Sequence, residues 1–404
     1  MRIGFVTTSF PRHIGDHAGV FIYEQAKNLV VRNVEVVVIA PHEQGVALRE
    51  DMEGVDVRRF VYMWPRKLQR LCYGSGILEN YRKHPWVLLE VPLLVVCAFV
   101  AVLRNCRDCD ILHAYWSIPG MVALVAGRIL GKPVILTTFG VELLVDSGLS
   151  ETISRMIIPR VDAVIAISQF TERRLLQLGQ PKRSEVIPFG IAIDVPFVVN
   201  PRDELVRRFN VTGSVKVVLA VGRLVQRKGF SYLIDAMDRI KGQAEAILLI
   251  GGTGPERGSL QRKIEHLGLN EMVRLVGYVR PEDMPLFYGG CDVFVLPSIE
   301  DASGDTEGLG MVLLEAQVYR KPVIGSAIGG IKDIITNEFN GLLVPAADPI
   351  ALAAALTTIF EDEEAARQMG ARGLAYVSEA FGWHHIIART TALYEATLKV
   401  GGVR

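Results

Sequence analysis

The sequence lacks an excess of charge of either sign, because 44 lysine and arginine residues balance 44 aspartate and glutamate residues among 404. Such a chain has no overall field that would hold nucleic acid at its surface, so we expect no nucleic-acid partner. Hydrophobic residues make up 50% of the chain, which excludes disorder as its main state. The length suffices for two or three domains with separate cores.

Cysteine is also scarce, and the five residues are too few and too scattered for a disulfide framework. Cys106 and Cys109 form a C-x-x-C pair, but no second cysteine pair or histidine pair completes a metal site. Asp108 and Asp110 have the spacing of a metal-binding Asp-x-Asp, yet they begin a buried strand, where acidic residues are common. We therefore expect no metal.

No apolar run of 18 or more residues is free of charge and proline, since the best candidate, residues 86–103, contains Glu90 and Pro92. We predict a buried or membrane-adjacent helix there rather than a membrane span. The chain begins directly with a β-type run and lacks the basic start and cleavage site of a signal peptide. Export is not predicted, and a cytoplasmic location is expected.

Short β-branched apolar runs alternate with longer amphipathic segments, which is typical of buried parallel strands between helices. The expected strands of the first half are 3–6, 35–40, 110–114, 134–138, 163–168 and 185–188. Those of the second half are 217–222, 246–251, 273–279, 293–297, 322–326 and 341–344. The fold class is therefore α/β, with doubly wound parallel-sheet domains at 1–190 and 191–378 and a last segment at 379–404.

The segment TEGLGMVLLEAQ, residues 306–317, places Glu307 and Glu315 on either side of an expected helix start. The first free N–H groups of that helix belong to Gly310, Met311 and Val312. They offer a partial positive charge to an anion such as a diphosphate. With Glu315 about 7 Å further along the axis, the order of carboxylate, anion socket and carboxylate matches hexose, diphosphate and ribose. An acidic helix start without a ligand would show the same spacing.

A second segment, GRLVQRKG at residues 222–229, follows an expected strand and carries Arg223 and Lys228 between Gly222 and Gly229. Ligands of α/β sheets bind at the carboxyl ends of the strands. Two fixed cations there can stabilise a departing diphosphate without a metal ion, each contributing on the order of 4 kcal/mol before desolvation. Solvated surface charge is the alternative interpretation.

Two glycine-rich turns lie at strand ends. The glycines of residues 248–260 match a dinucleotide fingerprint only loosely, because Pro255 fits the spacing poorly. We therefore exclude a dehydrogenase and predict at Gly252 a tight turn against a nucleotide. Near the N-terminus, Gly15 and Gly19 would let a loop approach a phosphate closely.

Basic and aromatic residues are mixed between residues 58 and 86, which suits an anionic lipid interface. The basic members are Arg58, Arg59, Arg66, Lys67, Arg70, Arg82 and Lys83, and the aromatic members are Phe60, Tyr62, Trp64, Tyr73, Tyr81 and Trp86. A solvated loop with some core aromatics is the alternative. We expect peripheral contact with an anionic membrane at its inner face.

Together these residues resemble the retaining glycosyltransferases of family 4, the group 1 glycosyl transferases. The likeness covers nearly the whole chain. It rests on the E-x7-E pair of Glu307 and Glu315, on GRL and KG at 222–229, on G-x-G-P-E at 252–256, and on DAVIAIS, VIPFGIAID, VRLVGYV, DVFVLPS and KPVIGSAIGGIKDII. The resemblance implies the GT-B fold of two facing Rossmann-like domains, with the last segment crossing back to the N-terminal domain.

The resemblance also implies roles. Arg223, Lys228 and Glu307 would be the catalytic residues, with the cations on the donor diphosphate and Glu307 on the transferred sugar. Glu315 would hold the ribose, and the backbone at Tyr278 and Val279 would face the base. The donor-binding set would comprise Gly15, Gly19, Gly222, Gly252, Tyr278, Val279, Gly308, Leu309, Gly310, Met311, Val312 and Glu315. The nucleotide sugar would be a substrate, and no cofactor is expected.

Two departures from the family pattern concern the sugar sites. Many members carry His-Gly-x-Asp where this chain reads FGVE at 139–142, so Phe139 replaces the histidine. A histidine contact on the acceptor side would then come from His17 or His113. The glutamate that often follows the Gly-Gly pair is Asp333 here.

The sequence thus predicts an enzyme that moves a hexosyl group from a UDP- or GDP-sugar to a hydroxyl of a glycan or lipid-linked acceptor. Retention, metal independence and a place in cell-envelope polysaccharide or glycolipid synthesis are expected. The sequence offers no obvious carboxylate nucleophile for a double displacement. The resemblance implies that the departing diphosphate helps to deprotonate the acceptor. The alternatives are a non-catalytic protein that binds a nucleotide sugar, and a GT-B phosphorylase or epimerase.

Overall fold

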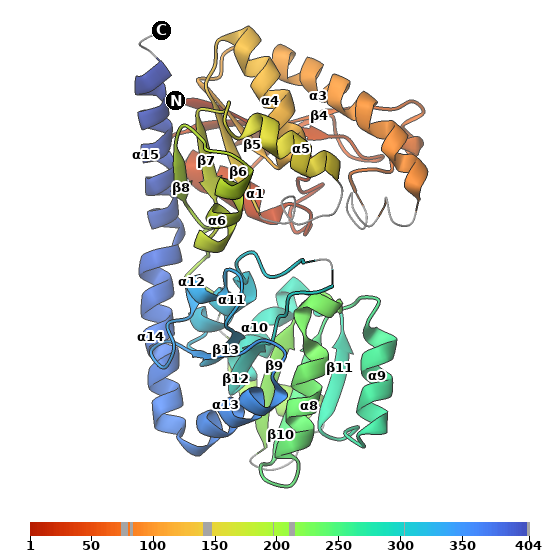
Figure 1. Cartoon of the computed structure of the whole chain (residues 1–404), viewed down its shortest axis with the longest axis vertical. Helices are drawn as coiled ribbons and strands as arrows, with labels where there is room; N and C mark the ends of the chain where they lie inside the picture. The colour runs from red at the N-terminus through yellow and green to blue at the C-terminus, as the bar shows by residue number, and fades with distance from the viewer. Residues whose placement is uncertain are drawn as a thin grey trace. The chain divides into compact units, whose positions relative to one another are not determined.

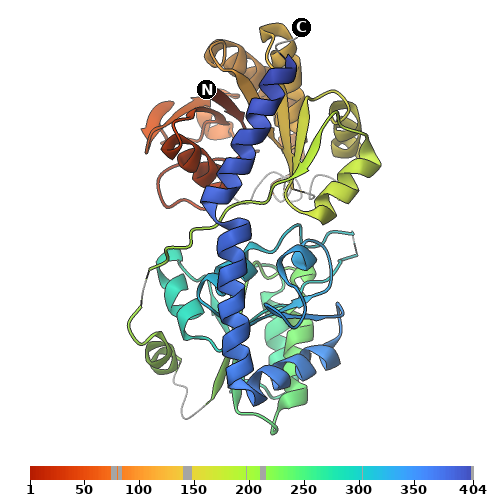
Figure 2. The ribbon, with the colours of Figure 1, turned by 90° about the vertical axis from the view of Figure 1, so that its left-hand side faces the viewer.

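The computed structural model describes residues 1–73, 80, 84–139, 148–196, 198–209, 215–302 and 304–401. The chain divides into unit 1, Met1–Gly190 with Trp383–Arg404, and unit 2, Ile191–Gly382. The last segment returns later than expected, because residue 379 lies inside α14 (Glu363–Phe381), a helix of unit 2. The final helix, α15 (Trp383–Gly401), packs on α1 (Val20–Val31) within unit 1 (Figure 2).

Unit 1 is built on an eight-stranded sheet with the order β3-β4-β2-β1-β5-β6-β7-β8. Figure 1 labels the strands β4 to β8 of this sheet. Its strands are β1 (Arg2–Val6), β2 (Glu35–Pro41), β3 (Arg49–Met52), β4 (Val55–Phe60), β5 (Ile111–Tyr115), β6 (Val134–Thr138), β7 (Ala163–Ala166) and β8 (Ser184–Val186). The strands run parallel apart from β3, which pairs antiparallel with β4 at the edge. Five of these strands are almost wholly buried because helices cover both faces, which explains their unbroken apolar runs.

Successive side chains of β5 point to opposite faces of the sheet and so enter two different cores. Leu112 and Ala114 belong to the core beneath α3 (Val91–Asn105), α4 (Ser117–Leu130) and α5 (Gly148–Ile157). His113 faces the other way, where its ring lies 2.7 Å from the hydroxyl of Tyr394 in α15. A further helix, α6 (Gln169–Leu178), packs beside β7 and β8.

Unit 2 contains a six-stranded parallel sheet with the order β11-β10-β9-β12-β13-β14. Its strands are β9 (Lys216–Val221), β10 (Ala246–Gly251), β11 (Val273–Gly277), β12 (Val293–Leu296), β13 (Val323–Ser326) and β14 (Leu342–Val344). Its helices are α7 (Pro201–Arg208), α8 (Phe230–Ile240), α9 (Arg257–His266), α10 (Met284–Gly290), α11 (Met311–Val318), α12 (Ile331–Ile334), α13 (Pro349–Glu361) and α14. In this unit α13 packs on α8, and α14 packs on α11. The twelve strands expected from the sequence are all present.

The β3–β4 hairpin is not predicted, and it corrects part of the expected lipid interface. The side chain of Arg59 is fully buried, pairs with Glu50 and donates to the carbonyl of Pro11 at 2.8 Å. Arg58 pairs with Asp56 at 2.6 Å. Phe60 and Tyr62 are buried as well. Tyr81, Arg82 and Lys83 lie outside the described residues.

Residues 86–105 comprise most of a 3-10 turn, η2 (Pro85–Glu90), and then α3. Among the described residues this segment is long and apolar enough to cross a membrane, by length and composition only. One face belongs to the core, with Leu94, Ala98 and Val102 buried. Leu89 and Val96 point elsewhere and are 78% and 58% exposed. The predicted buried helix is therefore buried along one face.

Candidate active site

A buried carboxylate, Glu307, is the centre of a charged cluster in unit 2. Its Oε2 accepts hydrogen bonds from Lys228 Nζ at 2.5 Å, from Arg227 at 3.3 Å and from Ser298 Oγ at 3.3 Å. Lys228 ends the turn η4 (Gln226–Lys228), and Gly229 follows it with a φ of +66°. A Cβ at Gly229 would lie 1.8 Å from the carbonyl oxygen of Pro297. Glycine is needed there because the turn presses on the residue that follows β12.

The two cations keep Glu307 ionised. Burial raises the pKa of Glu307, but the charges of Lys228 and Arg227 and the hydrogen bonds outweigh burial and lower it below its ordinary value. Arg227 also lies 3.4 Å from Asp305, whose pKa is raised by burial. Arg227 is not predicted from the sequence, although it is a third basic residue in GRLVQRKG, directly before Lys228.

The helix α11 begins at Met311, with Gly310 as its N-cap at a φ of +98°. No side chain of the described residues caps this end, so its first amides are open to an anion. A Cβ at Gly310 would lie 3.6 Å from Glu307 Cγ. The carboxylate bonded to Lys228 is thus adjacent to the start of α11.

The loop before α11 is held by a pair of glycines after β13. The N–H of Gly330 donates to the carbonyl of Glu307 at 2.9 Å. A Cβ at Gly329 or Gly330 would lie 2.1 Å from the carbonyl oxygen of Glu307 or of Gly308. The side chain of Leu309 is buried, so only its backbone is available to a ligand.

The second glutamate, Glu315, is oriented by a tyrosine. Tyr288 of α10 donates to Glu315 Oε2 at 2.5 Å, and its ring stacks on Tyr319 with a centroid distance of 5.6 Å. Burial raises the pKa of Glu315, and the hydrogen bond from Tyr288 opposes that rise. The sequence analysis does not identify Tyr288, which lies 27 residues before Glu315.

The turn after β10 braces the loop that carries Arg223. A Cβ at Gly252 would lie 1.8 Å from the carbonyl oxygen of Gly222, and the N–H of Leu224 donates to the carbonyl of Thr253 at 2.9 Å. A glycine at 252 is therefore needed for this contact between two loops, and its place against a nucleotide stays a prediction. Arg223 is exposed on the braced loop.

The residues predicted for the base follow β11. Tyr278 is 62% exposed, and Val279 Cγ2 would lie 2.9 Å from a Cβ at Gly251, beside the end of β10. Because the sheet is parallel, these residues share its carboxyl edge with Arg223 and Lys228. That edge is where α/β sheets bind ligands.

In unit 1, the predicted residues Gly15, His17 and Gly19 lie on the loop between β1 and α1. The side chain of His17 is 74% exposed and lies 3.5 Å from Asp16, and Gly15 has a φ of +90°. Gly19 is the N-cap of α1, and a Cβ there would lie 2.5 Å from the carbonyl oxygen of Ser9. This loop therefore approaches α1 closely at the carboxyl end of β1.

The expectation that His113 contacts an acceptor is corrected by its burial. The residue is 0% exposed, and its ring nitrogens lie 2.7 Å from the hydroxyls of Tyr394 and Thr137. Burial lowers the pKa of His113 to about 3, so the ring is neutral at ordinary pH. Phe139, which replaces the family histidine, directly follows β6 and stacks on Trp116.

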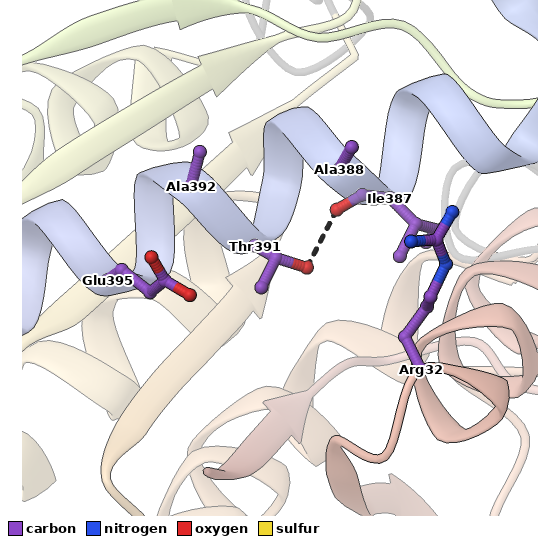
Figure 3. A pocket seen from close by; sticks show the side chains of 6 residues that line it. All are labelled: Arg32, Ile387, Ala388, Thr391, Ala392 and Glu395. Carbon is purple, nitrogen blue, oxygen red and sulfur yellow. Dashed lines mark hydrogen bonds between the residues drawn. The ribbon is translucent and has the colours of Figure 1, made fainter.

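A cavity of about 270 Å³ lies between the C-terminal end of α1 and α15, away from these residues (Figure 3). It is lined by Arg32, Ile387, Ala388, Thr391, Ala392 and Glu395. The hydroxyl of Thr391 donates to the carbonyl of Ile387 in its own helix at 2.7 Å. The lining residues include none of the predicted site residues, so this cavity is not part of the candidate active site.

Known proteins match both halves of the chain. Residues 18–195 match the family described as Glycosyltransferase Family 4, and residues 201–375 match Glycosyl transferases group 1. The chain is a family 4 glycosyltransferase. A relative of this glycosyltransferase is the GDP-mannose-dependent monoacylated alpha-(1-6)-phosphatidylinositol monomannoside mannosyltransferase of Corynebacterium glutamicum. It is 30% identical over 306 residues, which cover 73% of this chain and 79% of that protein.

Solved structures support the fold of this glycosyltransferase. Sucrose-phosphate synthase from Thermosynechococcus elongatus superposes with a TM-score of 0.80 and 22% identity, covering 99% of this chain and 100% of that chain. Anabaena HepE in complex with UDP gives a TM-score of 0.74 and 21% identity, with 98% and 100% coverage. The predicted GT-B fold is confirmed.

Proposed function

We propose that this glycosyltransferase moves a hexosyl group from a nucleoside diphosphate sugar to an acceptor hydroxyl, with retention of configuration and without a metal ion. The observation that carries the proposal is the pair of Lys228 and Glu307 beside the open start of α11. An ammonium group has three donor protons, so Lys228 can bond to Glu307 and to phosphate oxygens together. Glu307 would then present its free oxygen to hydroxyls of the transferred sugar.

The diphosphate would lie against the first amides of α11, with Lys228 and Arg223 supplying charge. A fixed donor to a leaving group that gains charge contributes about 2.7–4 kcal/mol to catalysis. Glu315, oriented by Tyr288, would accept hydrogen bonds from the ribose, and the backbone at Tyr278 and Val279 would contact the base. In this proposal the phosphate, ribose and base contacts named here would all come from residues of unit 2.

The named relatives support the choice of substrates. Since the Corynebacterium glutamicum protein is named for GDP-mannose and a phosphatidylinositol mannoside, we propose a GDP- or UDP-hexose donor and a glycan or lipid-linked acceptor. The structure of Anabaena HepE was solved with UDP, and for this reason we include UDP-sugars among the proposed donors. A place in cell-envelope glycolipid or polysaccharide synthesis follows from the same relatives.

An exposed surface of unit 1 supports a lipid-linked acceptor. This lipid-facing surface consists of Trp64, Arg66, Lys67, Leu68, Arg70, Trp86, Leu88, Leu89, Leu93 and Val96, and all of them are exposed. The guanidinium of Arg70 lies 5.8 Å from the ring centroid of Trp86, which joins its two segments. Apolar and aromatic side chains beside cations suit an anionic bilayer. We therefore propose peripheral binding at the cytoplasmic face.

The test is a thermal-shift screen with GDP, UDP, ADP and their hexose conjugates, followed by nucleotide release with crude lipid and glycan acceptors. We expect stabilisation by one base and release that depends on an acceptor. Stabilisation without release under any condition would favour the non-catalytic alternative. No stabilisation by any nucleotide would contradict the proposed donor site.

A further inference from the structure

Trp116, between β5 and α4, has a backbone conformation that is nearly exclusive to glycine. Its φ is +69° and its ψ is +165°, a region that is strained for any residue with a Cβ. Strand β6 and helix α4 hold it there by hydrogen bonds. Its N–H donates to the carbonyl of Thr137 at 3.2 Å, and its carbonyl accepts from the N–H of Gly120 at 2.9 Å. Glycine would fit this backbone without strain. The presence of tryptophan here is therefore explained by its side chain and not by its backbone.

The indole of Trp116 belongs to a stack of rings, the aromatic shelf, made of Phe21, Trp116, Phe139 and Phe189. Trp116 and Phe139 stack with centroids 4.7 Å apart and planes at 22°, and Phe139 stacks on Phe189 at 5.3 Å and 24°. Phe21, from the first turn of α1, lies 4.7 Å from Phe189. The stack fixes the orientation of the indole.

The aromatic shelf lies where a ligand of unit 1 would bind. Trp116 follows β5, Phe139 follows β6 and Phe21 begins α1, so all three lie at the carboxyl edge of the parallel sheet. Phe139 and Phe189 are buried, whereas Trp116 and Phe21 stay partly exposed. Because Phe139 covers one face of the indole, the accessible surface of Trp116 lies on its other face or at its edges.

We propose that the aromatic shelf binds the acceptor as a pyranoside, with the C–H face of the sugar ring against the open face of Trp116. The face of an aromatic ring is electron-rich and attracts the polarised C–H groups of a pyranose. The hydroxyls at the rim of the sugar remain free, and one of them can attack the donor. This inference rests on the proposed function, since it names the chemistry of the acceptor.

The proposal also accounts for Phe139. An imidazole at this strand end would offer a hydrogen bond to a sugar hydroxyl, whereas Phe139 offers only a ring that supports Trp116. The stabilisation from stacking on Phe139 is no larger than the destabilisation from the strained backbone of Trp116. A ligand on the open face adds the contact that the free protein lacks.

The experiment uses the full chain and three probes: octyl α-D-mannopyranoside, octyl α-D-glucopyranoside and, as a ring-free control, octyl tetraethylene glycol ether. Acceptor-dependent nucleotide release and tryptophan fluorescence are measured for the wild type, Trp116→Phe and Trp116→Ala. We expect Trp116→Ala to raise the acceptor KM about tenfold, with Trp116→Phe in between and nucleotide affinity unchanged. The fluorescence difference between the wild type and Trp116→Phe should respond to a pyranoside and not to the ether.

The matched control is Phe339→Ala, which removes an aromatic side chain of unit 2 that is 48% exposed, and it should leave both measurements unchanged. An unchanged acceptor KM in Trp116→Ala, or an equal fluorescence response to the ether, would overturn the inference. If Trp116→Ala does not fold, Trp116→Phe and the fluorescence titration decide. Absence of turnover with an intact pyranoside response would contradict the proposed function alone, so the two failures are distinguishable.

Discussion

Lys228 Nζ lies 2.5 Å from Glu307 Oε2, so the cation expected at the donor diphosphate and the carboxylate expected at the donor sugar form one buried ion pair. Neither group can be removed without leaving the other charge buried. Effects on catalysis and on stability therefore have to be measured on the same variants of Lys228 and Glu307.

Replacement of Lys228 by alanine should lower turnover by about two to three orders of magnitude, because a fixed donor to the leaving group is lost. It should also destabilise the protein by roughly 3 kcal/mol, because Glu307 keeps its charge without that partner. Initial rates of nucleotide release and urea unfolding check the two effects. Lys263→Ala is the control, since it removes another lysine of unit 2 that pairs with an aspartate, Asp235, at 2.6 Å.

The double variant Lys228→Ala with Glu307→Gln separates the two effects. We expect it to regain most of the lost stability, because the buried carboxylate that has lost Lys228 is no longer charged, and to remain inactive. If the double variant is as unstable as Lys228→Ala, the ion pair is not the cause of the destabilisation.

Replacement of Tyr288 by phenylalanine removes the hydrogen bond that orients Glu315 and little else. The net value of one hydrogen bond to a charged group is about 1.5–3 kcal/mol, so the donor KM should rise at least several-fold while kcat changes little. Tyr376→Phe removes a hydroxyl of the same unit that donates to the carbonyl of Asp333, and it should leave the donor KM unchanged. A loss of kcat at constant donor KM would argue against a role in ribose binding.

Acidification should destabilise unit 1 through His113. Its pKa is about 3 in the folded protein against an ordinary value of 6.5, so the unfolded chain binds the extra proton between these values. The stability is fully present above pH 6.5 and is lost as the pH falls below it, by roughly 1 kcal/mol per pH unit. Urea unfolding between pH 7 and pH 5 should show a smaller slope in His113→Asn. The exposed His266→Asn should keep the wild-type slope.

The carboxylate of Glu307 acts in a lower pH window. Its folded pKa is lowered, so its contribution is present above the ordinary value of 4.5 and is lost only as the pH falls through the folded value. The range from pH 7 to pH 5 therefore separates His113 from Glu307. Burial also lowers the pKa of His42, so the difference in slope between the wild type and His113→Asn is the measure of His113.

Serine at Leu89 and Val96 should weaken binding to vesicles of anionic lipid several-fold, because apolar area leaves the lipid-facing surface. Co-sedimentation at low and high salt measures this, and salt should release the wild type. Ile129 and Ile350 are 63% and 62% exposed, and their replacement by serine is the matched control. Equal losses in both pairs would mean that vesicle binding does not depend on this surface.

Much of the fold could be predicted because buried parallel strands are continuous apolar runs. The β3–β4 hairpin is not predicted, because β4 is no continuous apolar run and alternates buried Val55 and Val57 with half-buried Asp56 and Arg58. The glycine at position 54 is the signal that the sequence offers for this hairpin. In the structure Glu53 and Gly54 have φ values of +52° and +88°, which suit a tight hairpin turn.

The candidate site was predictable where its groups are neighbours in sequence and not where they meet through folding. Glu307 and Lys228 were found from local motifs. Tyr288 and the buried partners of His113 were not, because Thr137 and Tyr394 lie 24 and 281 residues from it. Contact between the loops of Gly222 and Gly252 likewise depends on the pairing of β9 with β10.

Because Tyr394 covers His113, the first unit of the polypeptide is closed by its last helix. During synthesis the ribosome makes all of unit 2 before this cover emerges. Until α15 has been synthesised, one face of the unit 1 sheet therefore lacks the helix that packs on it. Recombinant production of residues 1–190 alone should give an unstable product, and a graft of residues 383–404 onto that fragment should restore it.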